Sequence, residues 1–455
     1  MELRGGKVTV VGLGNSGINA CMLLNDIGSS VRATDSGDSP SLRKSAMLLK
    51  KKGIDAEVGG HTEGFIRGSS LVVLSPGVED ASPAVKWAEK SRIPIISEME
   101  LGYIFCKGRI IGITGTNGKS TVTTLIGEIL KSGGKDTVVC GNVGNSLCGE
   151  IVRIRPDTWV VLEVSSFQLE RIEKFKPYIA VILNITDDHM DRYKNFNKYF
   201  TEKLKIFKNQ GKGDILILNH DAVNLRGLKG KAKSETLFYS SKTKTNGAYI
   251  KDGKICCKYM GEEREIASVA DVKLKGLYNL ENVLACCLVG ALAGVKDSSV
   301  RDALKNFKGL SHRCETVGTI DDVEYIDDSK GTTVDSTLRA LESCDKSVVL
   351  IAGGKDKHSD YSLVRDMVKK RVSHIVLIGE AKEAIKDALK NTVPIHDAGD
   401  MRDAVKIAGS LVKPGSMVLL SPMCSSFDMF KDYKERGKAF KEAVESIKNR
   451  SSVKV

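Results

Sequence analysis

The apolar residues of this chain occur in short continuous runs that alternate with longer stretches of helical period, a pattern typical of α/β proteins. In the first hundred residues, apolar runs predict strands at residues 7–13, 31–34, 71–74 and 94–96. Between them, apolar positions three or four apart predict helices such as 16–27 and 41–52. Strands that alternate with helices pair in parallel, so we expect a small α/β domain with a parallel sheet over residues 1–97.

The same alternation continues in a second region, which we place at residues 98–308 after a helical connection at 99–106. Its predicted strands are 110–114, 137–139, 159–164, 181–185 and 215–218. Residues 230–275 differ, because short charged segments separated by turns predict a small antiparallel appendage. A helix is predicted at 279–293.

A third region, residues 309–455, has predicted strands at 323–326, 347–351, 374–378 and 417–420, again separated by helices. Three α/β domains in series also agree with the 455-residue length, at roughly 150 residues per domain. Nearly every polar cluster of interest follows the carboxyl end of an apolar strand, which is the edge where open α/β sheets bind ligands.

The composition narrows the class of protein. No apolar run approaches the roughly 18 residues of a membrane span, and the first residues lack the longer apolar stretch that a signal peptide needs, so we expect a cytoplasmic protein without a membrane partner. The net charge is +12, but the lysines are dispersed and only 5% of residues are aromatic, which argues against nucleic acid. The charge favours anionic small substrates, with a solvated lysine-rich surface as the alternative. The eleven cysteines lack Cys-x-x-Cys spacing and are expected to be reduced and mostly buried.

A glycine-rich loop lies between the predicted strand 110–114 and the helix that follows it. Its sequence is Gly115-Thr116-Asn117-Gly118-Lys119-Ser120-Thr121. Backbone N–H groups of such a loop point at phosphate oxygens, Lys119 adds a positive charge, and the Ser120 hydroxyl can bind Mg²⁺. The spacing is not the standard one, because Ile113 stands where the first glycine would be. The loop predicts ATP binding by a central domain of the P-loop ATPase type.

A second glycine-rich turn, Gly12-Leu13-Gly14-Asn15-Ser16-Gly17, follows the first strand, and Asp35 ends the next one. This arrangement is the Rossmann-like dinucleotide fingerprint, and it also suits any other nucleotide diphosphate. A tight turn with glycines for packing alone is the alternative. Ser75, after a third strand, could line the same crevice.

Carboxylates and a histidine follow two strands of the central domain. Glu163 ends the strand at 159–164, and the segment 184–193 contains Asp-Asp-His-Met-Asp. Oxygen ligands, with a nitrogen beside them, suit Mg²⁺ near a phosphate loop. A polar turn with a helix cap is the alternative reading of this segment.

Polar clusters also follow the strands of the third domain, where they begin at His312-Arg313, Asp327, Gly353 and Ser421. Their mixture of Arg, Lys, Ser and Thr suits a carboxylate-bearing small substrate and a migrating phosphate.

Taken together and in order, these motifs resemble those of the Mur ligases, the ATP-dependent amino-acid ligases of peptidoglycan precursor synthesis. The resemblance rests on the phosphate loop, on Glu163 to Leu169, on Asn184 to His189, on His312 to Glu315 and on Asp328 to Thr332. It implies an N-terminal Rossmann-like domain, a central ATP-binding domain and a C-terminal Rossmann-like domain that binds the amino acid.

Within the family the chain is similar to the members that add D-glutamate to UDP-N-acetylmuramoyl-L-alanine. This narrower likeness is carried by residues 189–193, by the first turn with Asp35-Ser36, and by residues 421–430 before Arg436-Gly437. The resemblance implies that ATP phosphorylates the substrate carboxylate and that the amine of D-glutamate attacks the acyl phosphate. We expect a monomer.

The resemblance also implies roles for single residues. Lys119, Glu163, His189 and Lys203 would be catalytic; Ser120 and Glu163 would hold one Mg²⁺ and His189 a second. Lys203 matches a lysine that is carbamylated in the family, with nearby Lys205 as the alternative. ATP would also contact Asn282, Arg313 and Asp328. The UDP substrate would contact Asn15, Ser16, Asp35, Ser36, Ser75, Asn142 and Gln168. D-glutamate would contact Thr332, Lys357, Ser426 and Tyr433, with Lys355 as the alternative to Lys357; Tyr433 stands where phenylalanine is familiar.

Three alternatives remain open from the sequence. A sister ligase would add L-alanine, a diamino acid or a glutamate on folate, and the third-domain signature argues against it. An NAD-dependent dehydrogenase would use the first turn and Asp35 but leave the second loop unexplained. A non-catalytic nucleotide-binding module would give Lys119, Glu163 and His189 no reason to coexist.

Overall fold

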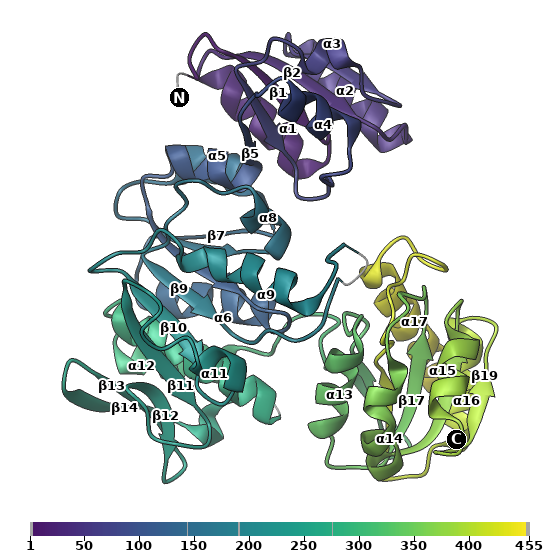
Figure 1. The fold of residues 1–455 in the computed structure, drawn as a ribbon. Coiled ribbons are helices and arrows are strands. Elements are labelled where there is room, and N and C mark those ends of the chain that lie inside the picture. Colours follow the sequence, from purple (N-terminus) through teal and green to yellow (C-terminus); the bar gives the residue numbers. More distant parts are fainter. Residues whose placement is uncertain (1–2, 143, 190–191, 275, 452–455) are drawn as a thin grey trace. The chain divides into compact units, whose positions relative to one another are not determined.

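The computed structural model describes residues 3–142, 144–189, 192–274 and 276–451, which contain three sheets (Figure 1). The residues up to Asp271, together with Glu281–Lys305, form one compact unit with two of the sheets. Val272–Leu280 and the residues from Asn306 onward form the second unit. None of the helices in the described part of the chain is long and apolar enough to cross a membrane.

The N-terminal sheet is fully parallel, with the strand order β3-β2-β1-β4-β5. Its strands are β1 (Lys7–Val11), β2 (Ser30–Asp35), β3 (Asp55–Val58), β4 (Leu71–Leu74) and β5 (Ile95–Ser97). Its helices are α1 (Asn15–Asp26), α2 (Pro40–Lys51), α3 (Glu63–Ile66) and α4 (Pro83–Lys90). Buried residues of α1 and α2 cover one face, and those of α3 and α4 cover the other. The predicted parallel sheet is confirmed, but the prediction lacked β3, whose polar sequence gives a weak apolar signal.

The central sheet has nine strands in the order β14-β13-β12-β11-β10-β9-β6-β8-β7. They are β6 (Arg109–Thr114), β7 (Thr137–Gly141), β8 (Trp159–Glu163), β9 (Ile179–Ile182), β10 (Ile215–Asn219), β11 (Glu235–Ser240), β12 (Gly247–Lys251), β13 (Lys254–Tyr259) and β14 (Glu262–Ser268). Its helices are α5 (Glu98–Phe105), α6 (Lys119–Ser132), α7 (Leu147–Glu150), η1 (Ile151–Arg153), α8 (Ser166–Glu170), α9 (Phe196–Leu204), η2 (Lys205–Phe207), α10 (Val223–Arg226), η3 (Val269–Asp271), α11 (Leu277–Leu292) and α12 (Asp297–Asn306).

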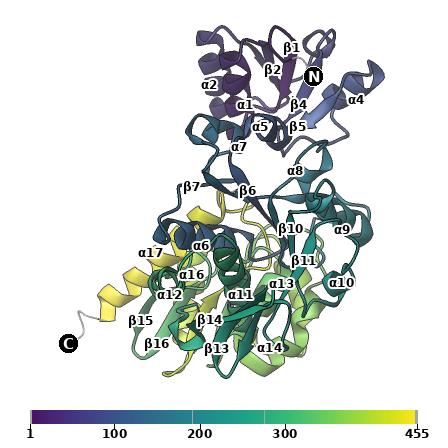
Figure 2. The same ribbon diagram turned by 90° about the vertical axis from the view of Figure 1, so that its left-hand side faces the viewer.

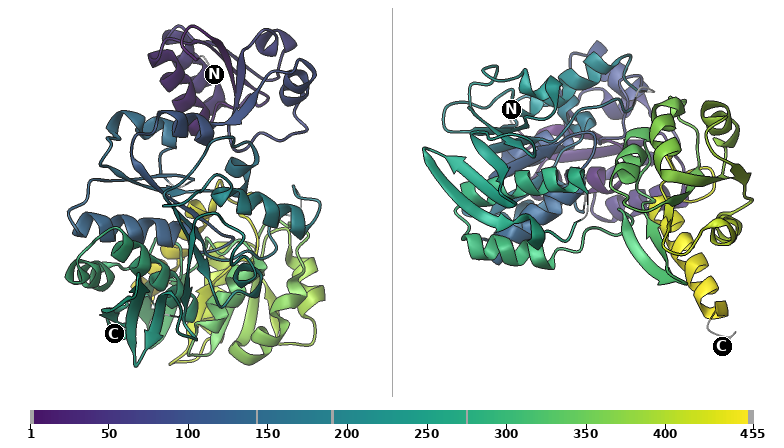
Figure 3. Two further views of the ribbon diagram at one scale, coloured as in Figure 1. Left: turned by 60° about the vertical axis from the view of Figure 1, so that its left-hand side comes forward. Right: turned by 90° about the horizontal axis from the view of Figure 1, so that it is seen from below.

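The predicted antiparallel segment is confirmed for β12, β13 and β14, which form the outer edge of the central sheet (Figures 2 and 3). It is not separate from that sheet, however. β11 pairs in parallel with β10 and β12 in parallel with β11, so the segment extends the sheet. The turn residues predict the hairpins that join β12, β13 and β14. They do not predict the pairing of β11, because its partner β10 lies outside the segment that contains those turns.

The C-terminal sheet has the order β15-β16-β20-β17-β18-β19. Its strands are β15 (Glu315–Ile320), β16 (Val323–Asp327), β17 (Val348–Gly353), β18 (Val372–Ile378), β19 (Ile395–Asp397) and β20 (Met417–Leu420). Its helices are α13 (Val334–Glu342), η4 (Tyr361–Val364), α14 (Arg365–Arg371), α15 (Lys382–Leu389), α16 (Met401–Leu411) and α17 (Tyr433–Ser451). Buried residues of α16 and α17 cover one face of the sheet, and those of α13 to α15 cover the other. The prediction lacked the edge strands β15 and β19.

Candidate functional site

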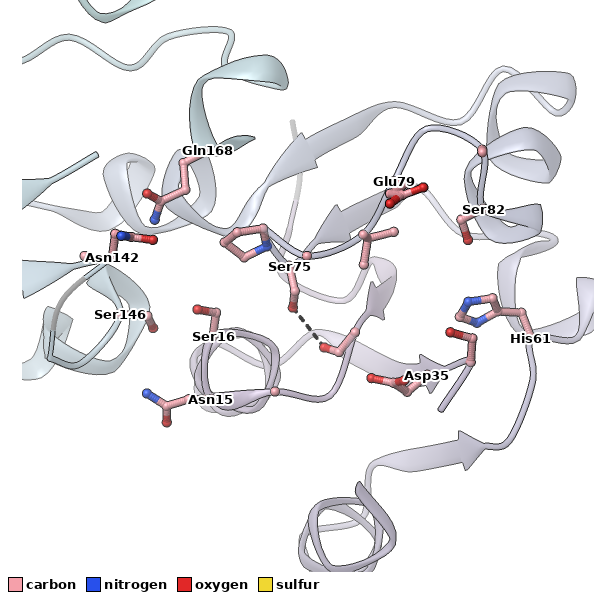
Figure 4. Close-up of a pocket in the computed structure, with 18 of the residues that line it drawn as sticks. Asn15, Ser16, Asp35, His61, Ser75, Glu79, Ser82, Asn142, Ser146 and Gln168 are labelled. Atoms are coloured by element: carbon pink, nitrogen blue, oxygen red, sulfur yellow. Dashed lines mark hydrogen bonds between the residues drawn. The ribbon is translucent and has the colours of Figure 1, made fainter. Parts of the chain in front are cut away.

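The first glycine-rich turn joins β1 to the amino end of α1 and comes close to the loop after β4. Gly12 has a φ of 94°, in the region that favours glycine. A Cβ atom on Gly17 would lie 1.7 Å from the Gly12 carbonyl oxygen, so only glycine allows this approach. The Ser75 hydroxyl donates to the same carbonyl at 2.9 Å (Figure 4).

Asp35 holds this turn in place through backbone contacts. Its two carboxylate oxygens accept hydrogen bonds from the Leu13 N–H at 2.7 Å and from the Gly37 N–H at 2.8 Å. The residue therefore shapes the walls of the crevice in addition to lining it.

All seven residues that the sequence predicts for the UDP substrate line one cavity of about 810 Å³ in the first unit. Asn15, Ser16, Asp35, Ser36 and Ser75 come from the N-terminal sheet, and Asn142 and Gln168 come from the central one (Figure 4). Sequence reasoning missed other polar lining residues: His61, Glu79, Ser82 and Ser146. His61 follows β3, the strand that the prediction lacked, so its position at a strand end was not visible.

The second glycine-rich turn, residues 115–118, joins β6 to α6. Gly118 has a φ of 85° and caps the helix, and Gly115 has a φ of 157°. The Lys119 ammonium folds back over the loop and donates to the carbonyls of Gly115 and Thr116, both at 2.8 Å. Ser120 and Thr121 lie buried in the first turn of α6. The loop thus has the conformation of a phosphate cradle.

Residues of the segment after β9 form hydrogen bonds with the phosphate loop. The Asn184 side chain accepts from the Asn117 N–H at 2.9 Å and donates to the Asn117 carbonyl at 3.0 Å. The Thr116 hydroxyl donates to the Thr186 carbonyl at 3.0 Å. These contacts fix the loop in one conformation.

Glu163 lies next to the loop because β8 pairs with β6 and Glu163 is in register with Ile113. Its side chain is buried, and its Oε1 accepts from the Asn142 amide at 2.8 Å. Its Oε2 is buried without a hydrogen-bond partner among the described residues. A buried carboxylate oxygen that accepts no hydrogen bond from the described residues can act as a cation ligand beside a phosphate loop, so the residues present fit the predicted Mg²⁺.

His189 follows β9, with a left-handed φ of 58° and a side chain that is 40% exposed. Its Nε2 lies 3.4 Å from an oxygen of Asp188, and its ring packs edge-on against Phe167 at 4.8 Å between centroids. The next two residues of the predicted segment, Met190 and Asp191, lie outside the described residues.

Lys203, on α9, is buried beneath the same loop. Its Nζ donates to the Gly115 carbonyl at 2.8 Å and lies 4.8 Å from the centre of the Tyr199 ring. Burial, and secondarily the charge of Lys119, lower the pKa of Lys203 well below its ordinary value. Lys205 instead forms a 2.5 Å ion pair with Glu202. Burial therefore favours the neutral form of the Lys203 amine.

In the second unit, the polar loops after the strands are gathered around Arg436. This fully buried guanidinium donates to the Ser329 hydroxyl at 3.0 Å and to the backbone carbonyls of Gly353, Cys424, Ser425 and Ser329. Burial lowers its pKa to about 10. The sequence motif includes Arg436 but assigns it no role. Its position shortly after the Ser421 loop was the signal that could have suggested one.

The predicted amino-acid residues lie on these loops. The Lys357 ammonium donates to the Thr332 carbonyl at 3.3 Å, whereas Lys355 is paired with Glu380 at 2.6 Å. Ser426 is buried, and Tyr433 begins α17, where its carbonyl accepts from the Ser329 hydroxyl. Lys357 therefore lies beside Thr332, another residue predicted for D-glutamate.

The residues predicted to contact ATP outside the loop are divided between the units. Asn282, on α11, belongs to the first unit, and its amide nitrogen is buried without a hydrogen-bond partner among the described residues. Arg313 and Asp328 belong to the second unit, where burial raises the pKa of Asp328 to about 7.

A separate cluster in the second unit consists of His312, Glu315 and Asp327, whose ligand atoms lie within 4.8 Å of one another. His312 is hydrogen-bonded to Asp327 at 2.7 Å, and Glu315 is paired with Lys441. These pairings satisfy the cluster without a metal ion.

Three family models match the chain in series. They are the Mur ligase MurD-like N-terminal domain at residues 6–97, the Mur ligase middle domain at 113–290, and the Mur ligase glutamate ligase domain at 312–424.

Curated relatives match along the whole chain. UDP-N-acetylmuramoylalanine--D-glutamate ligase of Koribacter versatilis is 44% identical over 98% of this chain and 99% of its own length. The protein of that name in Geotalea daltonii is 42% identical, with the same coverage.

Solved structures share the fold. UDP-N-acetylmuramate-alanine ligase MurC from Thermotoga maritima matches with a TM-score of 0.61 at 20% identity, over 97% of this chain and all of that one. MurF ligase from the same organism, in complex with ADP, matches with a TM-score of 0.58 at 14% identity, over 98% and 99% of the two chains. The three matching models and the full-length relatives above 40% identity show that the chain belongs to the Mur ligase family.

Proposed function

We propose that the protein joins D-glutamate to UDP-N-acetylmuramoyl-L-alanine at the expense of ATP. One observation carries the proposal beyond family membership. Asn142 lines the cavity that contains all seven predicted UDP-substrate residues, and it also donates to Glu163 beside the phosphate loop. A substrate held in the cavity can therefore present its far end to the loop. The dehydrogenase alternative gives the second loop no role, and dehydrogenation is not the activity of this family.

The chemistry follows from the poor reactivity of a carboxylate toward amines. Transfer of the ATP γ-phosphoryl group to the terminal carboxylate forms an acyl phosphate and ADP. The neutral amine of D-glutamate then attacks the carbonyl carbon, and collapse of the tetrahedral intermediate expels phosphate and leaves the amide. In this scheme the loop N–H groups and Lys119 orient the γ-phosphate and offset the charge that develops during transfer.

Ser120, Glu163 and His189 are the residues that would hold Mg²⁺ at two sites. When bound, Mg²⁺ would neutralise charge on the transferring phosphoryl group. The buried free oxygen of Glu163 supports its role as a ligand. Asn142, by occupying the other oxygen, orients the carboxylate.

Lys203 is proposed to be carbamylated. A neutral amine is required to attack CO₂, and burial lowers the pKa of this lysine. The resulting carbamate would place a negative group beneath the loop, next to the carbonyl of Gly115 that the amine now contacts.

Lys357, Thr332, Ser426 and Tyr433 are proposed to bind D-glutamate. Arg436 holds the loops that carry Ser329 and Ser426 and so positions this site. Asn282, Arg313 and Asp328 are proposed to contact ATP together with the loop.

The decisive test is ADP formation by the purified protein. We expect ADP release that requires both UDP-N-acetylmuramoyl-L-alanine and D-glutamate. We expect no release when L-alanine replaces D-glutamate. A requirement for L-alanine or a diamino acid instead would show a sister ligase and overturn the D-glutamate assignment. A monomer in the cytoplasm is part of the proposal, and light scattering of the purified protein tests the monomer.

A further inference from the structure

His61 lies in the loop between β3 and α3 and lines the cavity of the first unit. Figure 4 shows its ring at one end of the cavity, beside Asp35 and Ser82, whereas Asn142, Gln168 and Ser146 lie at the other end. Neither the sequence motifs nor the family resemblance assigns it a role in this chain.

The hydrogen bonds around Thr34 fix the tautomer of His61. The Thr34 hydroxyl has one hydrogen, and it donates this hydrogen to the Glu57 carboxylate at 2.8 Å. The same hydroxyl oxygen lies 2.8 Å from Nδ1 of His61. Because the hydroxyl hydrogen is already used, Nδ1 must be the donor in this second contact. Nδ1 therefore carries the proton.

Glu57 is itself held in place, which makes this arrangement rigid. Its Oε1 accepts from the Thr62 N–H and its Oε2 from the Thr62 hydroxyl, both at 2.9 Å. Thr34 is fully buried at the end of β2. The two contacts with Thr62 hold the Glu57 carboxylate where it accepts the Thr34 hydrogen.

With the proton on Nδ1, Nε2 of the neutral ring is an acceptor, and it has no hydrogen-bond partner among the described residues. Burial lowers the pKa of His61, and this effect outweighs the carboxylates of Asp35 and Glu57, which act in the opposite direction. Glu79, from the loop after β4, also lines the cavity. A neutral acceptor among carboxylates repels phosphate and attracts N–H or O–H donors.

We propose that His61 is a specificity-determining residue that accepts a hydrogen bond from the nucleoside half of the substrate. The donor is an N–H of the base or a hydroxyl of the ribose. The diphosphate then lies toward the amino end of α1, where backbone N–H groups point outward. This inference rests on the proposed UDP substrate.

Two variants separate contact with the ligand from support of Thr34. In H61Q the amide group reaches the position of Nε2 and can still accept there, but the Nδ1 donor is lost. In H61N the amide group takes the place of Nδ1 and can still donate to Thr34, but the acceptor in the cavity is lost. Calorimetry with UDP measures binding without ATP or D-glutamate.

We expect H61N to weaken UDP binding about 10-fold and H61Q to change it less than about 3-fold. The reverse order would show that His61 only supports Thr34, and wild-type affinity in both variants would equally overturn the proposal. The affinity of the wild type should fall as the pH drops below the lowered pKa, because a protonated Nε2 cannot accept. The affinity of H61Q should not share this fall.

CDP and 2′-deoxy-UDP identify the donor. If wild-type preference for UDP over CDP disappears in H61N, the donor is on the base; if the preference over 2′-deoxy-UDP disappears, it is on the ribose. Retention of both preferences overturns the proposal.

Failure of the wild type to bind UDP would overturn both the nucleotide assignment of the cavity and the role of His61. If the ligation reaction does not require D-glutamate while the UDP-binding results are as expected, only the proposed function is overturned.

Discussion

The two glycine-rich turns of the first unit have the same local design and different surroundings. Each follows a buried parallel strand, contains a glycine with positive φ, and opens a helix of twelve or more residues. The turn after β1 is held by the Asp35 carboxylate, and no Lys or Arg is among the described residues that line its cavity. The turn after β6 is contacted by two lysines, Lys119 and Lys203, which both donate to the Gly115 carbonyl.

This difference shows that the turn itself does not determine the chemistry. Backbone N–H groups and neutral side chains suffice to hold a phosphate that stays in place. A phosphoryl group in transfer develops charge that needs cations nearby. We therefore interpret the first turn as a binding site and the second as a reaction site, and four predictions test this contrast.

The largest effect is expected from Lys119→Met. Loss of the cation over the phosphate loop should lower kcat/KM for ATP about 1,000-fold, while UDP binding by calorimetry stays unchanged. Ser16→Ala, in the first turn, is the matched control and should raise KM for the UDP substrate with little change in kcat. If Lys119→Met loses less than about 10-fold, the second turn does not depend on its cation.

Lys203→Ala should lower kcat about 100-fold, because the proposed carbamate beneath the second turn is lost. Lys205→Ala, two residues away and paired with Glu202, should retain most activity. Intact mass of the wild type under CO₂ should show the addition of one CO₂, absent in Lys203→Ala. Normal turnover by Lys203→Ala would refute the assignment.

Gly17→Ala should displace the first turn, because the new Cβ would lie 1.7 Å from the Gly12 carbonyl oxygen. We expect about 1–3 kcal/mol of destabilisation in thermal unfolding and about 10-fold weaker UDP binding. Gly14→Ala is the control: its φ is −68° and no atom lies within 4 Å of the added Cβ, so the fold should tolerate it. Equal effects of the two substitutions would mean that close packing does not shape this turn.

The smallest effect concerns salt. Raising the ionic strength from about 0.05 to 0.5 M should weaken UDP binding less than about 2-fold, because the lining of its cavity, as far as the structure describes it, contains no Lys or Arg. ADP binding at the lysine-bearing turn should weaken several-fold. Calorimetry at matched pH measures both, and the same salt dependence for the two nucleotides would remove the contrast between the turns.

The sequence by itself determined the local features of this protein. Apolar runs fixed the central strands, and glycines fixed the two turns, because backbone conformation at these positions depends on neighbouring residues. The seven residues that the family resemblance assigns to the UDP substrate line one cavity, since the carboxyl ends of parallel strands meet at one edge. The motifs in their order were enough to identify the family.

Only the tertiary structure decided what surrounds these features. The edge strands β3, β15 and β19 were not predicted, because short polar strands are stabilised by pairing with distant neighbours. The burial that lowers the pKa of Lys203 depends on how α9 packs in the fold, and the link from Asn142 to Glu163 depends on how β7 and β8 pair. The tautomer of His61 depends on residues up to 27 positions away. Burial, register and proton position are properties of contacts between distant segments, and a local pattern in the sequence does not contain them.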